Sequence, residues 1–433
     1  METVLERPAT LRGDHTHNLR ADIRSRKAGE QLQDPRVLRK LLRSAGYDLG
    51  ELDPALRQRA LPSIRGGATG AGGVSFLSNL PPDNYQMNPA LFEQSTERQD
   101  IPQAQVPFNG FGSTSSFVLQ QVGVVALVRL YFTGTLVVGG TGAVTSYPGF
   151  PHSLAANVTL NANGQTKIIS VRGTTLRARR QRIFRNATET ITSSAGVPAG
   201  TISNGSYPIA FMLDVPISHD MFSGTGWLLA QNPSTTLSVD VSWANQADVF
   251  SIAAGGTVAL TGSTQWEVTS FAVGQAMAGN TAVTVIPDLT VFHGMLDKPT
   301  SFAAAGTLQA PLIRTAGQLT AYSANLRNGP GAEISPAALT SIKFRYGGNR
   351  IPRDFNPPQM LLQKNMDDYN GLVVVNGLTY TFFDFEVDNP TRDLFLPESL
   401  VELQAQFDIP TSVTVNSGAY LLSMQESLYP AVG

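Results

Sequence analysis

The densest group of chemically active side chains is a run of arginines between residues 172 and 185. Guanidinium groups bind phosphates and carboxylates through paired hydrogen bonds. A basic helix here would bind either phosphate or the carboxylates of a neighbouring subunit. We favour the carboxylates, because the body of the chain is net negative and aromatic residues do not alternate with the arginines. Six arginines and no acidic residue fall within these 14 residues: Arg172, Arg177, Arg179, Arg180, Arg182 and Arg185.

The histidines and paired acids give weaker signals for catalysis or metal binding. His15 and His17 have no third ligand nearby, and His152, His219 and His293 lie beside Pro, Ser or Gly in expected loops. Glycoside hydrolysis needs two carboxyl groups facing each other across a cleft, and no spacing in the sequence places them so. We therefore expect solvated or inter-subunit roles for the acid pairs Asp367-Asp368 and Asp384/Glu386.

The sequence also lacks common catalytic motifs, which argues against an enzyme. The chain has no Gly-x-x-x-x-Gly-Lys-Ser/Thr, Gly-x-Ser-x-Gly or His-Glu-x-x-His motif. It has no cysteine, which excludes disulfides, thiolate catalysis and Cys-based metal centres. We expect no enzymatic activity, no metal and no cofactor.

Composition points to a chain that is covered by neighbours. Its 433 residues are too many for one typical core. Charged residues make up 15%, against about 25% in an average soluble domain. The net charge of −2 excludes a globally basic nucleic-acid coat. The sequence shows no run of about 18 apolar residues that would span a membrane and no signal peptide, so we expect folding inside the cell.

Residues 1–75 differ from the rest and are expected to form a charged arm. They hold 13 Lys+Arg and 9 Asp+Glu, whereas the remaining residues hold 18 and 24. The Asp34-Pro35 start predicts a short helix with a basic face against a neighbouring subunit, an anionic membrane or nucleic acid. A second Asp-Pro start at Asp53 and a Gly-rich hinge at 66–73 follow. The basic face comprises Arg36, Arg39, Lys40 and Arg43.

From residue 108 onward the apolar residues alternate with period two, which predicts strands with one buried face. An Asn-Gly turn predicts a hairpin between Asn157–Leu160 and Lys167–Val171. Helical spacing predicts two short helices, at Thr174–Asn186 and Asn356–Tyr369. The clearest alternating segments are Val128–Val138, Tyr207–Val215, Leu237–Trp243 and Leu400–Phe407.

Residues 251–263 read as a weak strand or linker that divides the body. We therefore predict an all-β fold of two consecutive eight-stranded jelly rolls, at 76–260 and 261–433, with short helical insertions and an N-terminal helical arm. No short tandem repeat accompanies this division.

The order of elements over roughly residues 105–428 resembles the double jelly-roll major capsid proteins of tectivirus-like bacteriophages, which are tailless and contain an internal membrane. In this resemblance Phe108–Phe111 and Val128–Thr135 open the first roll, and Trp266–Phe271 opens the second. The remaining matching segments are the Asn157–Val171 hairpin with its following helix, Tyr207–Ser218, Gly226–Asn232, Leu237–Trp243, Leu400–Phe407 and Tyr420–Glu426.

The resemblance implies a homotrimer whose six jelly rolls make a pseudo-hexagonal tile of an icosahedral phage shell. The implied partners are neighbouring capsomers, penton and minor capsid proteins and an internal lipid membrane reached by the arm, with no specific nucleic acid. The protein would be made in the host cytoplasm and reside in the virion. The alternatives are a phage spike or receptor-binding protein, which Trp227, Trp243 and Trp266 at expected core positions disfavour, and a jelly-roll enzyme acting on glycans.

Overall fold

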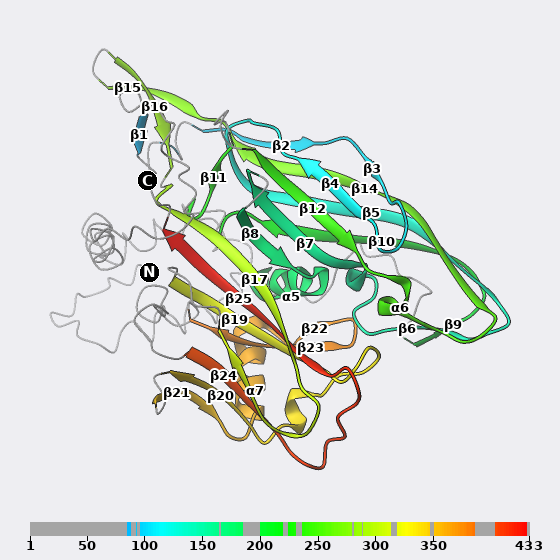
Figure 1. Ribbon diagram of the computed structural model, residues 1–433. Helices are drawn as coiled ribbons and strands as arrows, with labels where there is room; N and C mark the ends of the chain where they lie inside the picture. Colours follow the sequence, from blue (N-terminus) through cyan, green and yellow to red (C-terminus); the bar gives the residue numbers. More distant parts are fainter. Residues whose placement is uncertain are drawn as a thin grey trace, which may run out of the picture. The chain divides into compact units, whose positions relative to one another are not determined.

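The computed structural model is described for the body of the chain, and these residues belong to one compact unit, Thr69–Gly433. The basic arm with Arg36, Arg39, Lys40 and Arg43 lies outside the described residues, as does Arg185. Strands dominate and the helices are short (Figure 1). The described residues are 85–87, 92, 96–163, 166–184, 200–219, 224–230, 236–278, 281–287, 289–312, 318–346, 350–385 and 403–430.

The first roll is a sandwich of two antiparallel sheets built from residues 98–271. Between them lies a core that includes Phe132, Phe211, Trp243 and Trp266. One sheet has the order β10 (Gly205–Pro216), β5 (Val124–Gly140), β14 (Gly256–Phe271), β2 (Arg98–Pro102). The other has the order β8 (Thr166–Val171), β7 (Ala155–Ala162), β12 (Leu237–Trp243), β4 (Thr114–Val118).

The second roll is built from residues 291–430 and encloses a core of its own, to which Tyr322, Phe344, Phe383 and Phe407 belong. One sheet has the order β22 (Val373–Val375), β23 (Leu378–Asp384), β19 (Gln318–Arg327), β25 (Tyr420–Pro430), β17 (Val291–Ser301). The other has the order β18 (Gly306–Pro311), β24 (Leu403–Ile409), β20 (Ser341–Tyr346), β21 (Arg350–Phe355).

The two rolls share one continuous sheet. Strand β8 of the first roll pairs in parallel with β17 of the second, Met295 opposite Ile169 and Leu296 opposite Ser170. The result is a nine-stranded sheet that runs from β22 to β4 through both rolls (Figure 1). The predicted double jelly roll is therefore confirmed.

The predicted local elements are also found. In β12 the apolar positions are buried and the Ser and Asp positions between them are half-buried, as the alternation requires. Strands β7 and β8 form the predicted hairpin. The two predicted helices are α5 (Gly173–Phe184) and α7 (Gln359–Tyr369). Helix α7 ends at Asn370, which takes the left-handed conformation at φ 59° that suits a helix C-terminus.

Short elements complete the fold. The 3₁₀ turns η1 (His152–Leu154) and η2 (Pro336–Ala338) precede β7 and β20, and α6 (Gln246–Val249) follows β12. The remaining strands form two small sheets, β1-β16-β15 and β13-β6-β9, or pair singly: β11 with the start of β5, and β3 with the middle of β14. Their bounds are β1 (Tyr85–Met87), β3 (Val106–Pro107), β6 (Val144–Ser146), β9 (Gly200–Ile202), β11 (Leu228–Leu229), β13 (Phe250–Ile252), β15 (Gly274–Ala278) and β16 (Thr281–Ile286).

The predicted boundary between the rolls at 260/261 is wrong. Strand β14 begins at Gly256 and pairs with β5 as far as Phe271, so the boundary falls inside a strand of the first roll. Trp266–Phe271, which the resemblance assigned to the second roll, closes the first one. The start of β14 reads weakly in the sequence because Thr257, Ala259 and Thr261 are exposed and carry no large apolar side chain.

Candidate functional site

Helix α5 brings two arginines to a buried carboxylate at the junction of the rolls. Arg179 donates from Nε and Nη2 to Oε1 of Glu426, at 2.8 and 2.6 Å. Arg182 donates from Nη2 to Oε2 of the same carboxylate at 2.6 Å, and its Nη1 lies 3.3 Å from Oδ2 of Asp384. Glu426 is fully buried and the two arginines nearly so. The helix belongs to the first roll and the acids to β25 and β23 of the second, so these ion pairs join the rolls.

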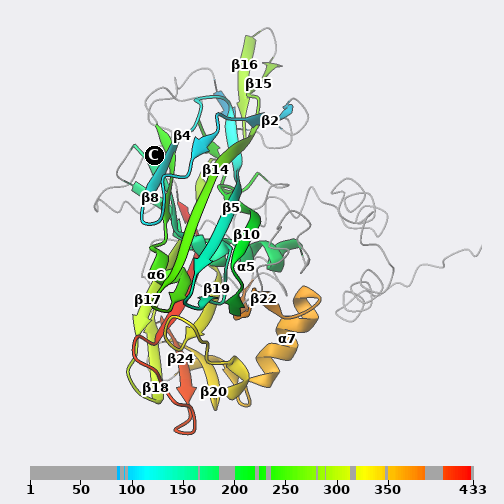
Figure 2. The same ribbon diagram turned by 90° about the vertical axis from the view of Figure 1, so that its right-hand side faces the viewer.

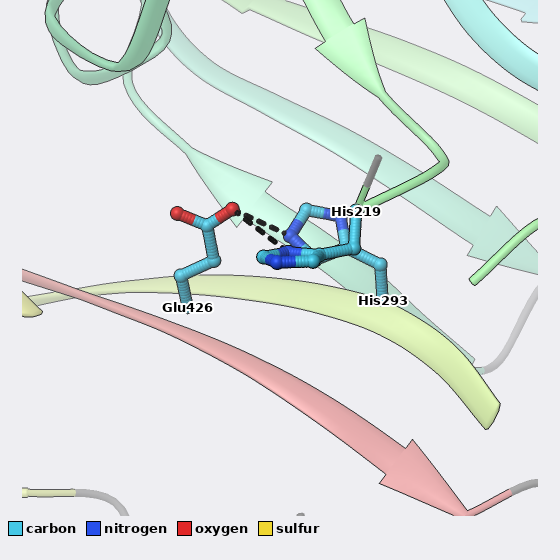
Figure 3. Close-up of side chains that lie close together, drawn as sticks. All are labelled: His219, His293 and Glu426. Carbon is cyan, nitrogen blue, oxygen red and sulfur yellow. Dashed lines mark hydrogen bonds and ion pairs between the residues drawn. The ribbon is translucent and has the colours of Figure 1, made fainter. Parts of the chain in front are cut away.

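Two histidines lie together beside one oxygen of the same carboxylate (Figure 3). Nε2 of His293 on β17 lies 2.9 Å from Oε1 of Glu426, and its Nδ1 lies 2.9 Å from the carbonyl oxygen of Pro216. Nδ1 of His219 lies 3.6 Å from the same Oε1. Burial lowers the pKa of His293 to about 4, so its ring is neutral at neutral pH and its single N–H reaches one acceptor at a time.

The charges of the cluster balance without the histidines. Burial alone would raise the pKa of Glu426, but the guanidinium groups of Arg179 and Arg182 hold it well below its usual range. Glu426 and Asp384 then offset the two arginines. Two buried arginines whose guanidinium nitrogens meet two carboxylates satisfy the rule that buried charges are paired.

A third carboxylate of the second roll, Asp297 on β17, contacts the start of α5. Its Oδ2 accepts the backbone N–H of Arg172 at 2.7 Å and the hydroxyl of Thr175 at 2.9 Å. Carboxylates are favourable at helix N-termini, where backbone N–H groups lack partners within the helix. Burial nevertheless raises the pKa of Asp297 to about 7. The helix is thus held by the second roll at its first turn and again through its arginines.

The histidines and Glu426 have the composition of a metal site, but not its electrostatics. One ligand atom from each of the three residues lies within 4.8 Å of the others. However, Oε1 of Glu426 already accepts two N–H groups from Arg179, so a metal ion there would sit against a guanidinium charge. Zinc sites use ligands that are free to coordinate the metal. The arrangement fits a structural ion-pair network and not a metal centre.

The predicted basic helix is present, but its partners differ from the prediction. Arg179 and Arg182 bind acids of the second roll, and Nη1 of Arg180 binds Asp214 on β10. The prediction of partners in neighbouring subunits is wrong for these three residues, because they pair with acids of the same chain. Arg177 is buried, and Arg185 lies outside the described residues.

Sequence reasoning missed the acidic half of the cluster. The sequence predicts His293 in a loop, whereas it lies in β17. It predicts a solvated or inter-subunit role for Asp384, whereas Asp384 pairs with Arg182 of the same chain. Glu426 had one available signal, since it is the only charged residue in the segment Tyr420–Pro430. A lone acid in an otherwise uncharged strand indicates a buried partner.

The chain is similar to known proteins in fold and not in sequence. No protein-family model matches the chain, and no characterised protein matches its sequence significantly. Among solved structures, the STIV MCP gives a TM-score of 0.58 at 15% identity, covering 77% of this chain and 97% of that one. In the atomic structure of Sulfolobus Turreted Icosahedral Virus the matching chain gives 0.57 at 14%, covering 78% and 91%.

The PBCV-1 virus capsid gives a TM-score of 0.52 at 12% identity, covering 77% of this chain and 93% of that chain. These similar structures are major capsid proteins with two jelly rolls in one chain. The chain has the double jelly-roll fold of these viral major capsid proteins.

Proposed function

We propose that the chain is the major capsid protein of an icosahedral virus and assembles as homotrimeric capsomers. The observation that carries this proposal is the presence of two jelly rolls in one chain, joined by a continuous sheet. Three such chains supply six similar jelly rolls, the number that a pseudo-hexagonal capsomer requires. The similarity to the STIV MCP over nearly all of that chain supports the same role.

The role is structural and depends on the burial of apolar surface within each roll and between copies. Each roll encloses its own apolar core, and the trimer then covers further surface between copies. Permanent interfaces of this kind typically bury more than about 2,000 Å². A large covered surface accounts for a charged fraction of only 15%.

The finer assignments come from the resemblance in element order. They are a bacteriophage host, contacts with penton and minor capsid proteins, and an internal membrane under the shell. No described helix has both the length and the apolar character needed to cross a membrane. We assign membrane or neighbour contact to the basic face of the arm: Arg36, Arg39, Lys40 and Arg43.

A spike or receptor-binding protein is the second candidate, and the tryptophans count against it. Such a protein would bind its ligand in a groove lined by aromatic residues. Trp227, Trp243 and Trp266 are all buried and pack on other aromatic rings of the body. These are all three tryptophans of the chain.

Size-exclusion chromatography with light scattering on the purified protein tests the proposal. A homotrimer has three times the chain mass of 46.3 kDa, about 139 kDa. A stable monomer at micromolar concentration would refute it. Copy number in purified virions separates the two candidates, because a shell protein is present in hundreds of copies and a spike in far fewer.

A further inference from the structure

The two rolls repeat one plan element by element. The order β10-β5-β14-β2 in the first roll corresponds to β23-β19-β25-β17 in the second, and β8-β7-β12-β4 corresponds to β21-β20-β24-β18. The turns η1 and η2 each precede the hairpin, and α5 and α7 each follow it. Each helix contacts the matching 3₁₀ turn and the matching strand of its own roll, β10 or β23. Helix α7 is therefore the counterpart of α5.

Among the residues that the structure describes, helix α5 makes a contact with the other roll that α7 lacks. It lies against the outer face of the second roll, where Arg179 and Arg182 reach Glu426 and Asp384. Burial consequently extends over all sides of α5 from Gly173 to Arg179. Helix α7 is buried only at Leu361, Asn365 and Tyr369.

The side of α7 that faces away from its own roll is exposed. We call it the α7 face; the helix itself lies beside β22 (Figure 2). Two large apolar side chains lie on it, Met360 at 55% and Met366 at 42% exposure. The α7 face comprises Gln359, Met360, Gln363, Met366 and Asp367.

The outer face on which α5 docks also has a counterpart in the first roll. In the second roll one row across three strands reads Asp384, Ala321, Glu426. In the first roll one row reads Asp214, Arg129, Glu267, across β10, β5 and β14. The aspartate and the glutamate thus recur at matching positions.

The middle residue of each row explains how its acids are neutralised. Ala321 is small and uncharged, so the second roll takes its positive charges from α5. In the first roll Arg129 donates from Nε to Asp214 at 3.1 Å and from Nη1 to Glu267 at 2.7 Å, and Arg180 of α5 in the same roll also pairs with Asp214. The first row therefore needs no arginine from a docking helix, and α7 contains none.

The next row of residues on each outer face locates the contact with the helix more precisely. In the second roll Phe382, Ser323 and Met424 lie in one row, and Phe382 and Met424 pack in the core cluster of the first roll. Two residues along from Asp214, Arg129 and Glu267, the matching row is Met212, Tyr131, Gln265. Gln265 is exposed, and it is the counterpart of Met424.

We propose that the α7 face of one copy docks on the outer face of β10, β5 and β14 in the next copy, around Gln265. The contact repeats between chains what α5 makes within the chain. It is heterologous, because two different surfaces meet, and such contacts generate a closed ring when the rotation allows. This inference rests on the proposed homotrimer and names the surfaces that build it.

Cysteine cross-linking tests this placement cleanly, because the chain has no cysteine of its own. The test variant carries Met366→Cys and Gln265→Cys and is treated with a flexible bis-maleimide. We expect covalent dimers and trimers on a denaturing gel. A mixture of chains carrying one substitution each should stop at dimers. The matched control carries Met366→Cys with Val118→Cys, an exposed apolar position on β4, and should stay monomeric on the gel.

Light scattering on the same samples distinguishes a failure of this docking contact from a failure of the proposed trimer. A trimer whose test pair does not cross-link, or whose control pair cross-links equally, refutes the inference and leaves the proposed function standing. A monomer refutes the proposed function itself. As an independent measure, Met360→Asp with Met366→Asp should shift the mass from trimer toward monomer, whereas Val118→Asp should leave the trimer intact.

Discussion

Glu426 carries the negative charge that two buried arginines share, and it does so where the two rolls meet. Replacing a whole buried ion pair by apolar residues often changes stability little, whereas removing one partner leaves an uncompensated charge. The cluster therefore stabilises one arrangement of the two rolls relative to others. Any other placement of the second roll would leave Arg179 and Arg182 buried without their acid.

The first prediction concerns this carboxylate. Glu426→Gln keeps the shape but removes the charge, so we expect a loss of roughly 3–5 kcal/mol in the free energy of unfolding. The matched control is Glu267→Gln in the counterpart row, where the side chain is 37% exposed and the expected loss is below about 1 kcal/mol. Urea unfolding measures both, and equal losses would contradict the role given to Glu426.

The second prediction concerns pH and Asp297. Its pKa is raised from 3.8 to about 7 in the folded protein, so the folded state binds more protons than the unfolded state between these values. The contribution of this group to stability is therefore complete below about pH 4 and is lost as the pH rises through about 7.

Asp297→Asn removes this titration. We expect the variant to match the parent near pH 4 and to exceed its free energy of unfolding at pH 8, by up to about 4 kcal/mol. Unfolding curves across this range for the two proteins give the difference directly. A parallel pH dependence in parent and variant would show that Asp297 does not titrate in this window.

Helix α5 and strand β14 show what sequence patterns can and cannot predict. The helix, the hairpin before it and the alternation in β12 follow from local periodicity, and each was predictable. The partners of Arg179 and Arg182 were not, because Glu426 lies more than 240 residues along the chain and no local pattern brings it close. The start of β14 was missed because a strand with small exposed residues lacks the apolar contrast on which the prediction depends.

The third prediction concerns the approach of β17 to β8. At Gly294 on β17 an added Cβ would lie 2.4 Å from the Tyr429 ring and 3.1 Å from the carbonyl oxygen of Ile168. Gly294→Ala should therefore displace the Tyr429 ring or β17 itself and cost roughly 1–3 kcal/mol. Gly205 on β10 is the control, because a Cβ there meets only ordinary contacts at 3.4 Å or more. Thermal unfolding compares the two, and an unchanged midpoint in Gly294→Ala would show that the junction can yield.

The whole molecule uses one plan twice without repeating its sequence. The shared plan shows in strand order, in the two helices and in the two acidic rows, while the residues between the acids differ. In our proposal this difference assigns different tasks to the two faces: the acids beside Ala321 pair with arginines of the same chain, and the face of Arg129 is covered by another copy. Fold class was predictable from the order of elements, but the two acidic rows depend on register across strands and are visible only in three dimensions.

The last prediction concerns the arm, whose net charge of +4 opposes the −6 of the remaining residues. The apolar clusters of the described body are formed by residues from Phe92 onward, so the body has a core of its own. Deleting residues 1–65 should leave three chains per particle and a nearly unchanged thermal unfolding midpoint. Shell formation should fall, because the basic face would no longer reach a neighbour or an anionic membrane. Light scattering and electron microscopy measure the two effects, and loss of folding would place the arm in the core instead.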